Sequence, residues 1–392
     1  MGTTTRVLVV SKPVVPPWDD GSKTLVRELV SGALGTEFVV PVHRGLAWDP
    51  VRDGIVAAKQ EAGRVEPWAV YRTDPGKSPG FGQKAWLMAG LVRAPRSDLV
   101  HFFFAPNLVS SMAGRLAGMI GSRPVVQTVS SAPKSYSRVK WLTFADKVVV
   151  LSRDTRDGFL SAGVPAWRLR VIYPGVTVPE TVDRAGSEVR KRYGLGQDRL
   201  VLYAGDYDFS QAARTSLEAA LQVCRQQTGV RFLFAGRIKN ETSANVEQQL
   251  KARVAQAGLT DRIRFYNWLP DFLDLLDTVD LTVLPAESVY AKVDLPLTLL
   301  EAMARATPVV VADSGPLPEL VVGDVGRLVR AQDADELART VLGLLRDERA
   351  LRVMGDQARQ LVRERFSVER MAEEYEDLYG ELLDGGRSRR ER

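Results

Sequence analysis

Short runs of apolar, often β-branched residues recur along the chain, and amphipathic stretches fill the intervals between them. Most runs are continuous rather than alternating with polar residues, which is typical of parallel strands covered on both faces. Regular alternation of such strands with helices, through short connections, predicts doubly wound α/β domains. The predicted strands are Arg6–Val10, Glu37–Val40, Asp98–Phe104, Pro124–Thr128, Asp146–Leu151, Leu169–Ile172, Arg199–Ala204, Val230–Ala235, Arg262–Tyr266, Asp280–Leu284, Pro308–Val311 and Gly326–Val329. The main predicted helices are Thr24–Ala33, Leu108–Ile120, Arg153–Ala162, Gln211–Gln227, Ala244–Ala257, Leu297–Ala306, Ala334–Arg346 and Ala350–Phe366.

Two prolines and a glycine in the segment Tyr173–Glu180 end the last strand of the first half and mark a domain boundary. We therefore expect two Rossmann-like domains, residues 1–178 and 179–367, that face each other across a cleft. The helix predicted over residues 368–384 follows the second domain, and its periodicity leaves open whether it packs back onto the first. Ligands of open parallel sheets bind beyond the carboxyl ends of the strands, so functional residues are expected just after strands.

Composition narrows the class of protein. Of the 392 residues, 45% are hydrophobic and 26% are charged, which is ordinary for a pair of folded domains. The formal net charge of +5 is a mild bias that suits an anionic small-molecule substrate or loose contact with an anionic surface. Nucleic-acid binding is not expected, because it requires a concentrated basic stripe with groups that read or stack on bases.

Cysteine and histidine usage excludes further classes of protein and of binding site. Cys224 is the only cysteine, so neither a disulfide nor a cysteine metal site can form, which fits a reducing cytoplasm. The two histidines, His43 and His101, are widely separated and lack an acidic cluster, so we expect no metal and no required cofactor. No apolar run is long enough to span a membrane, so a cytoplasmic protein is expected, with peripheral membrane contact left open.

The strongest candidate site lies between the strand that ends at Leu284 and the helix that follows. Proline suits the first helical position, so Pro296 predicts a helix start whose free N–H groups belong to Leu297 and Thr298. Together with the helix dipole, these N–H groups form an anion site suited to a diphosphate. Glu301, one turn further on, is placed to accept hydrogen bonds from ribose hydroxyls. The alternative is a structural loop, with Glu301 as a solvated helix residue.

Two features of the first half each have two possible interpretations. The sequence Gly21-Ser22-Lys23-Thr24 allows close backbone approach to a ligand, yet Ser22 interrupts the Gly-Lys-Ser/Thr order that a phosphate-binding P-loop requires. The alternative is a plain helix start with Asp20 as the N-cap. His101 ends a predicted strand, where it either helps to position a substrate or packs, hydrogen-bonded, under neighbouring aromatic residues.

Several segments together resemble one known family. The best matches are Leu299–Ala304, Thr307–Val311 and Pro318–Val321, which resemble the signature of glycosyltransferase family 4 (group 1). Weaker matches are Asp98–His101, Pro124–Thr128, Val150–Ser152, Val171–Val176 and Phe234–Arg237. The resemblance implies a GT-B fold, with an acceptor-side first domain and a second domain that binds the nucleotide sugar. It also implies retaining transfer without a protein nucleophile, in which the leaving phosphate takes the acceptor proton.

Three positions depart from the family pattern. Val293 stands where the family usually has a glutamate, which makes the flanking Lys292 and Asp294 the candidates to orient the sugar and assist the leaving group. Gly205-Asp206 follows the first strand of the second domain, where the family often carries an arginine and a lysine. Since fixed cations must stabilise the leaving diphosphate, the charge would come from residues elsewhere. The candidates to supply it are Arg237, Lys239 and Lys292. The third departure is Ser130, which stands where the family often has a histidine.

The favoured function is therefore retaining transfer of a sugar from a nucleotide diphosphate to a hydroxyl acceptor, which is a glycan, a lipid-linked molecule or a small natural product. Gly205, Asp206, Gly21 and Ser22 complete the expected nucleotide-sugar contacts. The acceptor is expected near Gly21–Lys23, His101 and Ser130. Two alternatives remain open: a nucleotide-sugar epimerase on the same fold, and a catalytically silent nucleotide-binding partner of another transferase.

Overall fold

The chain divides into two compact units, as seen in a computed structural model. The first unit comprises Met1–Gly175, Ala291–Asp294 and Ser367–Arg392, and the second comprises Val176–Tyr290 and Leu295–Phe366. The structure describes residues 4–18, 20–56, 63–72, 90–108, 111–112, 114–115, 123–267, 269–290 and 292–390, apart from the side chains of Val92 and residues 386–390. The chain thus passes from the first unit to the second after Gly175.

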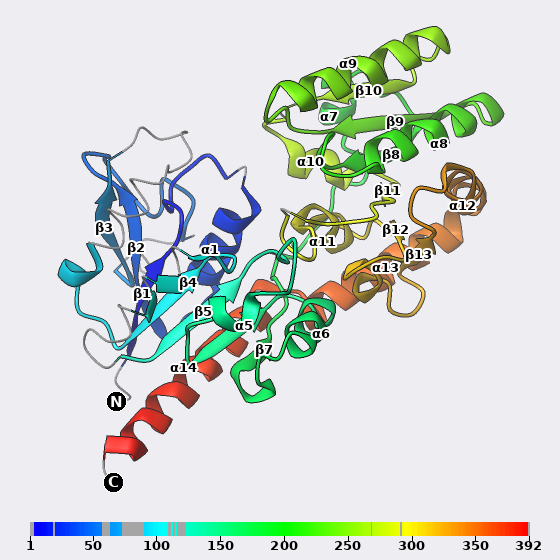
Figure 1. The fold of residues 1–392 in the computed structure, drawn as a ribbon. Helices are drawn as coiled ribbons and strands as arrows, with labels where there is room; N and C mark the ends of the chain where they lie inside the picture. The colour runs from blue at the N-terminus through cyan, green and yellow to red at the C-terminus, as the bar shows by residue number, and fades with distance from the viewer. Residues whose placement is uncertain are drawn as a thin grey trace. The chain divides into compact units, whose positions relative to one another are not determined.

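The first unit is built on a seven-stranded sheet in the order β3-β2-β1-β4-β5-β6-β7, in which every neighbouring pair is parallel (Figure 1). Its strands are β1 (Thr5–Val10), β2 (Thr36–His43), β3 (Val65–Tyr71), β4 (Leu99–Phe103), β5 (Val125–Val129), β6 (Lys147–Val150) and β7 (Leu169–Val171). Its described helices are α1 (Gly21–Gly32), η1 (Leu91–Arg93), α5 (Val139–Leu142), α6 (Arg153–Ser161), η2 (Ala166–Arg168) and α14 (Val368–Arg390).

The second unit is built on a six-stranded parallel sheet in the order β10-β9-β8-β11-β12-β13. Its strands are β8 (Arg199–Ala204), β9 (Val230–Ala235), β10 (Ile263–Tyr266), β11 (Leu281–Leu284), β12 (Val309–Ala312) and β13 (Gly326–Val329). Its helices are α7 (Ser187–Arg192), α8 (Ala212–Gln226), α9 (Glu241–Gln256), α10 (Phe272–Asp277), α11 (Leu297–Ala304), η3 (Leu317–Leu320), α12 (Ala334–Arg346) and α13 (Glu348–Arg365). Both sheets confirm the prediction of doubly wound parallel domains.

The apolar runs predicted the sheets well, with one omission. Every predicted strand is present, but the edge strand β3 was missed because it contains Pro67 and its exposed residues interrupt the apolar run. Proline is tolerated at a sheet edge, where its missing N–H costs no ladder bond. The short helix α10 was also not predicted, and much of the predicted helix Leu108–Ile120 lies outside the described residues.

Each sheet has its own apolar core. Buried side chains from β1, β3 and β4 pack together in the first unit, including Leu8, Trp68 and Phe102. In the second unit, Leu202 of β8 and Leu233 of β9 pack with residues of α10 and α11. Strands that bury both faces need apolar residues at successive positions, which explains why the sequence shows continuous runs.

The last helix, α14, belongs to the first unit although it follows the second in the sequence. It packs against α1, where Gly32 gives it room: a Cβ on Gly32 would lie 2.4 Å from a methyl group of Val368. Further along α14, the Glu376 carboxylate accepts hydrogen bonds from the Gly35 N–H, 2.7 Å away, and the Thr36 hydroxyl, 2.9 Å away. The first unit therefore includes α14.

Candidate active site

The carboxyl ends of β8 and β9 bring two of the predicted loops together. The N–H of Gly205, just after β8, donates to the carbonyl of Ala235 at the end of β9, 3.2 Å away. A Cβ on Gly236 would lie 2.5 Å from Cζ of Tyr207 and 2.9 Å from the Gly205 carbonyl oxygen. Only glycine fits there without moving the loop. Gly236 therefore allows the segment that carries Asp206 to pack closely against the end of β9, just before Arg237.

Asp206 and Lys239 form an ion pair at this edge. The Lys239 ammonium lies 2.8 and 2.9 Å from the two carboxylate oxygens of Asp206, which is largely buried. The Tyr203 hydroxyl donates to the Asp206 carbonyl oxygen, 2.6 Å away, and fixes the backbone of the loop. The Lys239 ammonium also lies 4.9 Å above the ring of Phe209. Lys239 is thus held in place, and Asp206 offsets part of its charge.

Helix α11 begins at Leu297, as its predicted range does, but Pro296 does not occupy the first helical position. Pro296 is the N-cap, outside the helix, because the helix begins at Leu297. The N–H groups of Leu299 and Leu300 bond to the Pro296 carbonyl, 3.0 and 3.4 Å away. Those of Leu297 and Thr298 meet no acceptor within the described part of the chain, as expected for the first two residues of a helix.

Glu301 follows Leu297 by four residues and Thr298 by three, so it lies about one helical turn beyond these two N–H groups. Glu301 and Thr298 are both partly exposed, whereas the side chain of Leu297 is buried. The Arg305 guanidinium donates to the Glu301 carbonyl oxygen, 3.3 Å away, and steadies the end of this short helix. Two N–H groups at the helix start and a partly exposed glutamate therefore lie within about one turn of each other.

Glu287 was not singled out from the sequence, yet it organises the loop after β11. Its carboxylate oxygens accept from the Gln211 N–H, 2.9 and 3.1 Å away, just before α8. Its carbonyl oxygen accepts from the Ser314 hydroxyl, 2.9 Å away, just after β12. Glu287 thus joins three loops at one sheet edge. No motif marks it, since a glutamate in a loop carries no signal without its partners.

Asp294 lies elsewhere than the sequence suggested, since it belongs to the first unit. Its side chain is completely buried, and its carboxylate oxygens accept from the Ala132 N–H, 2.7 Å away, and the Ser152 hydroxyl, 3.0 Å away. Burial raises the pKa of Asp294 to about 6, although these hydrogen bonds oppose the shift. With both oxygens engaged and no exposed surface, Asp294 holds the loop in place rather than meeting a solvent-accessible ligand. Lys292, in the same short segment, is partly exposed.

Gly21 and Ser22 occupy the first turn of α1, and the helix-cap alternative is confirmed for this segment. Asp20 is the N-cap, and its carboxylate accepts from the Ser22 N–H and hydroxyl, 2.9 and 2.5 Å away. Burial opposes ionisation of Asp20, but the Lys12 ammonium, 2.5 Å away, and the Ser22 hydrogen bonds outweigh it and lower the pKa to about 2. Both polar groups of Ser22 are therefore engaged within the helix cap.

Of the two interpretations of His101, the structure shows the packed, hydrogen-bonded one, and the side chain does not face a ligand site. It has no exposed surface, with Nδ1 2.7 Å from the Tyr379 hydroxyl and Nε2 2.7 Å from the Thr128 hydroxyl. The Thr128 hydroxyl in turn lies 2.9 Å from that of Tyr375. Burial holds the pKa of His101 well below its usual value, so the ring is neutral at pH 7. Ser130 is also largely buried.

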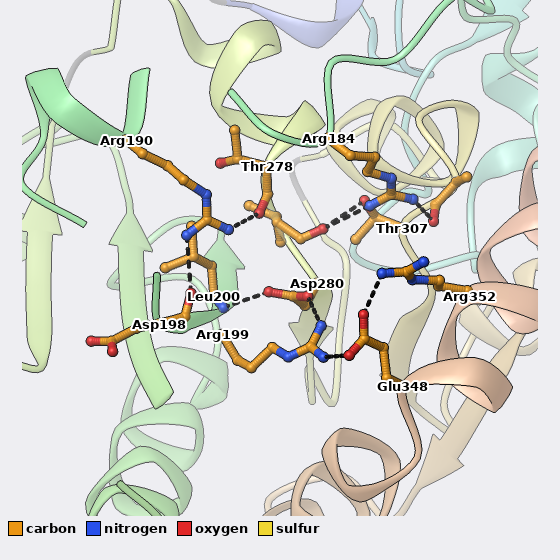
Figure 2. A network of polar contacts seen from close by, with 12 residues as sticks. Arg184, Arg190, Asp198, Arg199, Leu200, Thr278, Asp280, Thr307, Glu348 and Arg352 are labelled. Atoms are coloured by element: carbon orange, nitrogen blue, oxygen red, sulfur yellow. Dashed lines mark hydrogen bonds and ion pairs between the residues drawn. The ribbon is translucent and has the colours of Figure 1, made fainter. Parts of the chain in front are cut away.

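A denser group of charges lies at the opposite edge of the second sheet (Figure 2). Asp280, just before β11, accepts from the Arg199 guanidinium and the Leu200 N–H, each 2.8 Å away. Arg199 also pairs with Glu348 at the start of α13. These residues lie at the amino ends of strands, whereas ligands of parallel sheets bind at the carboxyl ends. The network in Figure 2 therefore stabilises the unit and is no candidate active site.

A cavity of about 670 Å³ lies in the second unit beside the edge strand β10. The end of α7 and the second half of α9 complete its walls, and none of the predicted site residues lines it. No group of three or more potential metal ligands occurs among the described residues. Within the same residues, no helix combines the length and apolar character that crossing a membrane requires.

The two parallel doubly wound units define the GT-B class of glycosyltransferase fold, and comparison with solved structures agrees. A crystal structure of Anabaena Alr3699/HepE in complex with UDP-glucose superimposes with a TM-score of 0.75 at 20% identity, and covers 96% of this chain and all of that one. Models of two families match the sequence: Glycosyltransferase Family 4 over residues 26–178, and Glycosyl transferases group 1 over residues 187–361. The predicted fold and family are thus confirmed.

Curated relatives place the chain within this family. It is 31% identical over 323 residues to the lipopolysaccharide core biosynthesis mannosyltransferase LpcC of Rhizobium leguminosarum bv. viciae, covering 80% of this chain and 88% of the relative. It is 23% identical over 309 residues to the N-acetyl-alpha-D-glucosaminyl L-malate synthase of Bacillus anthracis, covering 76% and 78%. The chain belongs to the group 1 family of glycosyltransferases and is a glycosyltransferase.

Proposed function

We propose that this enzyme transfers a sugar from a nucleotide diphosphate to a hydroxyl acceptor with retention of anomeric configuration. The observation that carries the proposal is the start of α11, where the N–H groups of Leu297 and Thr298 lack acceptors in the described chain and Glu301 follows one turn later. Solved Alr3699/HepE holds UDP-glucose on the same fold, which supports a nucleotide-sugar donor for this chain.

In this proposal, the donor binds at the carboxyl edge of the second sheet. The diphosphate accepts hydrogen bonds from the Leu297 and Thr298 N–H groups and is favoured by the positive end of the α11 dipole. The Glu301 carboxylate accepts hydrogen bonds from the ribose hydroxyls. Gly205 and Asp206 form the neighbouring loop, which Gly236 holds close to β9.

The positive charge that the leaving group needs comes from residues outside the loop after β8. Lys239 is fixed by Asp206, so a diphosphate that approaches it exchanges one anionic partner for another. Arg237, two residues after the end of β9, supplies further positive charge at this edge, and Lys292, five residues before Leu297 in the sequence, is the other candidate cation. Fixed cations of this kind stabilise the transition state because they need no reorganisation as the negative charge develops.

In the transfer step, the bond from the anomeric carbon to the β-phosphate oxygen breaks, and a bond from that carbon to the acceptor oxygen forms on the same face of the sugar. The departing phosphate takes the proton of the acceptor hydroxyl, so no protein base is required. Asp294 is a positioning residue in this scheme: its buried carboxylate anchors the segment that carries Lys292.

A nucleotide panel tests the donor site. We expect one of UDP, GDP, ADP and dTDP to raise the melting temperature, since a ligand at one hundred times its Kd adds about 2.7 kcal/mol of stability. Glu301→Ala should weaken this binding by about tenfold or more, because a ribose hydroxyl loses a charged hydrogen-bond acceptor. The control is Glu218→Ala, which removes only a half-exposed carboxylate paired with Arg253.

Product analysis tests the reaction. With the matching nucleotide sugar and an array of hydroxyl acceptors, NMR of the product should show the anomeric configuration of the donor, and Lys292→Ala should lower kcat more than it raises KM. Inversion would refute the retaining assignment. Nucleotide binding without any transfer would identify a catalytically silent member, and rearrangement of the sugar without an acceptor would identify an epimerase.

A further inference from the structure

Two tryptophans of the first unit are unusually exposed. Trp141 in α5 has 71% of its surface exposed, and Trp167 in η2 has 67%. An indole has a large apolar face and one polar N–H, so it is rarely left in water without a partner that covers it. Both side chains lie in short helical segments just before a strand, α5 before β6 and η2 before β7.

Direct contacts place these two segments together. The Arg115 guanidinium donates to the Trp141 carbonyl oxygen, 2.6 Å away, and the Lys147 ammonium donates to that of Trp167, 3.0 Å away. The Lys140 side chain passes beside Gly163, with its Cδ 3.5 Å from where a Cβ on that glycine would be. The loop before η2 therefore lies against α5.

Arg168 extends this surface. Its guanidinium donates to the carbonyl oxygen of Ala145, 2.6 Å away, in the turn between α5 and β6. We name the set formed by Trp141, Trp167, Arg115, Lys140, Lys147 and Arg168 the tryptophan surface.

The surface lies at the amino ends of β6 and β7, which form one edge of the parallel sheet. Ser130 and Ser152 follow the carboxyl ends of β5 and β6, at the opposite edge. A ligand on the tryptophan surface is therefore far from the strand ends where the chemistry of parallel α/β domains takes place. The surface is suited to anchor the enzyme rather than to take part in transfer.

The charge of the surface identifies the kind of partner. Four cations accompany the two indoles, and Asp146, next to Lys147 in the sequence, contributes one carboxylate, so positive charge predominates. Protein interfaces favour tryptophan and arginine but are depleted in lysine. Indoles interleaved with lysine and arginine match an anionic lipid surface, because indoles settle at the level of the headgroups and the cations meet their phosphates.

We propose that the tryptophan surface is a docking site for an anionic lipid membrane, bound peripherally. The inference is independent of which donor or acceptor the enzyme uses. Charge attraction brings the surface to the headgroups, and the Trp141 and Trp167 side chains then move from water into the headgroup region of the membrane. The attraction is screened by salt, whereas the indole contribution is not, so binding weakens as salt rises.

Sedimentation with lipid vesicles tests the proposal in the full chain. The wild type should bind vesicles that contain phosphatidylglycerol at least about tenfold more tightly than vesicles of phosphatidylcholine alone, since electrostatic attraction to each cation multiplies the affinity. Trp141→Ala combined with Trp167→Ala should lower this binding by about tenfold or more, as should Lys140→Glu combined with Lys147→Glu. The matched control is Lys191→Glu with Arg225→Glu, which changes the net charge equally on exposed helix positions of the second unit and should retain most of the binding.

Three results would overturn the proposal. The first is equal binding to both kinds of vesicle, and the second is a tryptophan double variant that binds as the wild type does. The third is self-association without lipid that the tryptophan double variant abolishes, since a second copy of the chain would then cover this surface. Circular dichroism of each variant shows whether a loss of binding reflects misfolding, and brominated lipids that quench wild-type but not double-variant fluorescence would support insertion independently.

Discussion

The hydroxyl of Ser152 donates a hydrogen bond to the carboxylate of Asp294 across 3.0 Å, and neither side chain has any exposed surface. Ser152 is also the N-cap of α6, where its oxygen accepts from the Thr155 N–H, 3.1 Å away. One serine therefore caps a helix of the first unit and holds a segment that arrives from between β11 and α11. The ionisation of Asp294 is coupled to the stability of this arrangement.

We expect the stability contributed by Asp294 to decrease as the pH rises. Burial raises its folded-state pKa from 3.8 to about 6, so its contribution is present in full below about pH 4 and is lost as the pH rises through about 6. Relative to Asp294→Asn, the wild type should lose on the order of 3 kcal/mol of unfolding free energy between about pH 4 and pH 7. Denaturant titrations of both proteins across this range measure the difference, and parallel profiles would contradict it.

The network in Figure 2 should affect stability without affecting nucleotide binding. Asp280→Asn replaces a carboxylate oxygen that faces the Arg199 guanidinium or the Leu200 N–H with an amide donor. We expect a loss of about 1–3 kcal/mol, because a buried donor loses its acceptor. Thermal melts with and without the matching nucleotide provide the test. The nucleotide-induced shift should stay as in the wild type, and a weaker shift would place the network in the donor site.

Gly236→Ala should damage both the fold and the donor site. The new Cβ would meet the Tyr207 ring at 2.5 Å and the Gly205 carbonyl oxygen at 2.9 Å, so the loop after β8 must move. We expect a cost of about 1–3 kcal/mol from overpacking, together with weaker nucleotide binding. The control is Gly343→Ala in α12, where nothing lies within 4 Å and alanine should stabilise the helix by about 0.5–1 kcal/mol. Unchanged nucleotide affinity in Gly236→Ala would separate this loop from the donor site.

Tyr379→Phe should show that α14 completes the first unit. Removing the hydroxyl leaves Nδ1 of the buried His101 without its partner, 2.7 Å away, and should cost about 1–3 kcal/mol of unfolding free energy. Tyr290→Phe is the control, because that side chain is 42% exposed and its loss should change stability by less than about 0.5 kcal/mol. Equal effects of the two substitutions in denaturant titrations would argue against a structural role for the His101 contact.

The sequence predicted the sheets because buried parallel strands require apolar residues at successive positions, and that requirement is local. It missed β3 because an edge strand tolerates Pro67 and because three of its seven residues are exposed. It placed Pro296 one position too far into α11, since proline is accepted both at the N-cap and at the first helical residue. Errors of this kind arise because a residue such as proline is compatible with more than one local position or element.

The candidate site was harder to predict because its contacts join distant parts of the chain. Nothing near Asp294 in the sequence indicates that its partners are Ala132 and Ser152. His101 was left undecided for the same reason, because its partner Tyr379 lies almost at the other end of the chain. The helix start at α11 was predicted more successfully, since a loop followed by a short apolar helix and Glu301 is a local signal.

Placing α14 in the first unit has a consequence for synthesis on the ribosome. The hydroxyls that satisfy His101 and Thr128 reside on Tyr379 and Tyr375, so they emerge only after the whole second unit has been made. At typical elongation rates of about 5–20 residues per second, the first unit waits on the order of ten seconds or more for the hydroxyls that α14 supplies. The half that leaves the ribosome first is therefore the half that matures last, and a nascent chain arrested before residue 367 would expose it to chaperones and proteases.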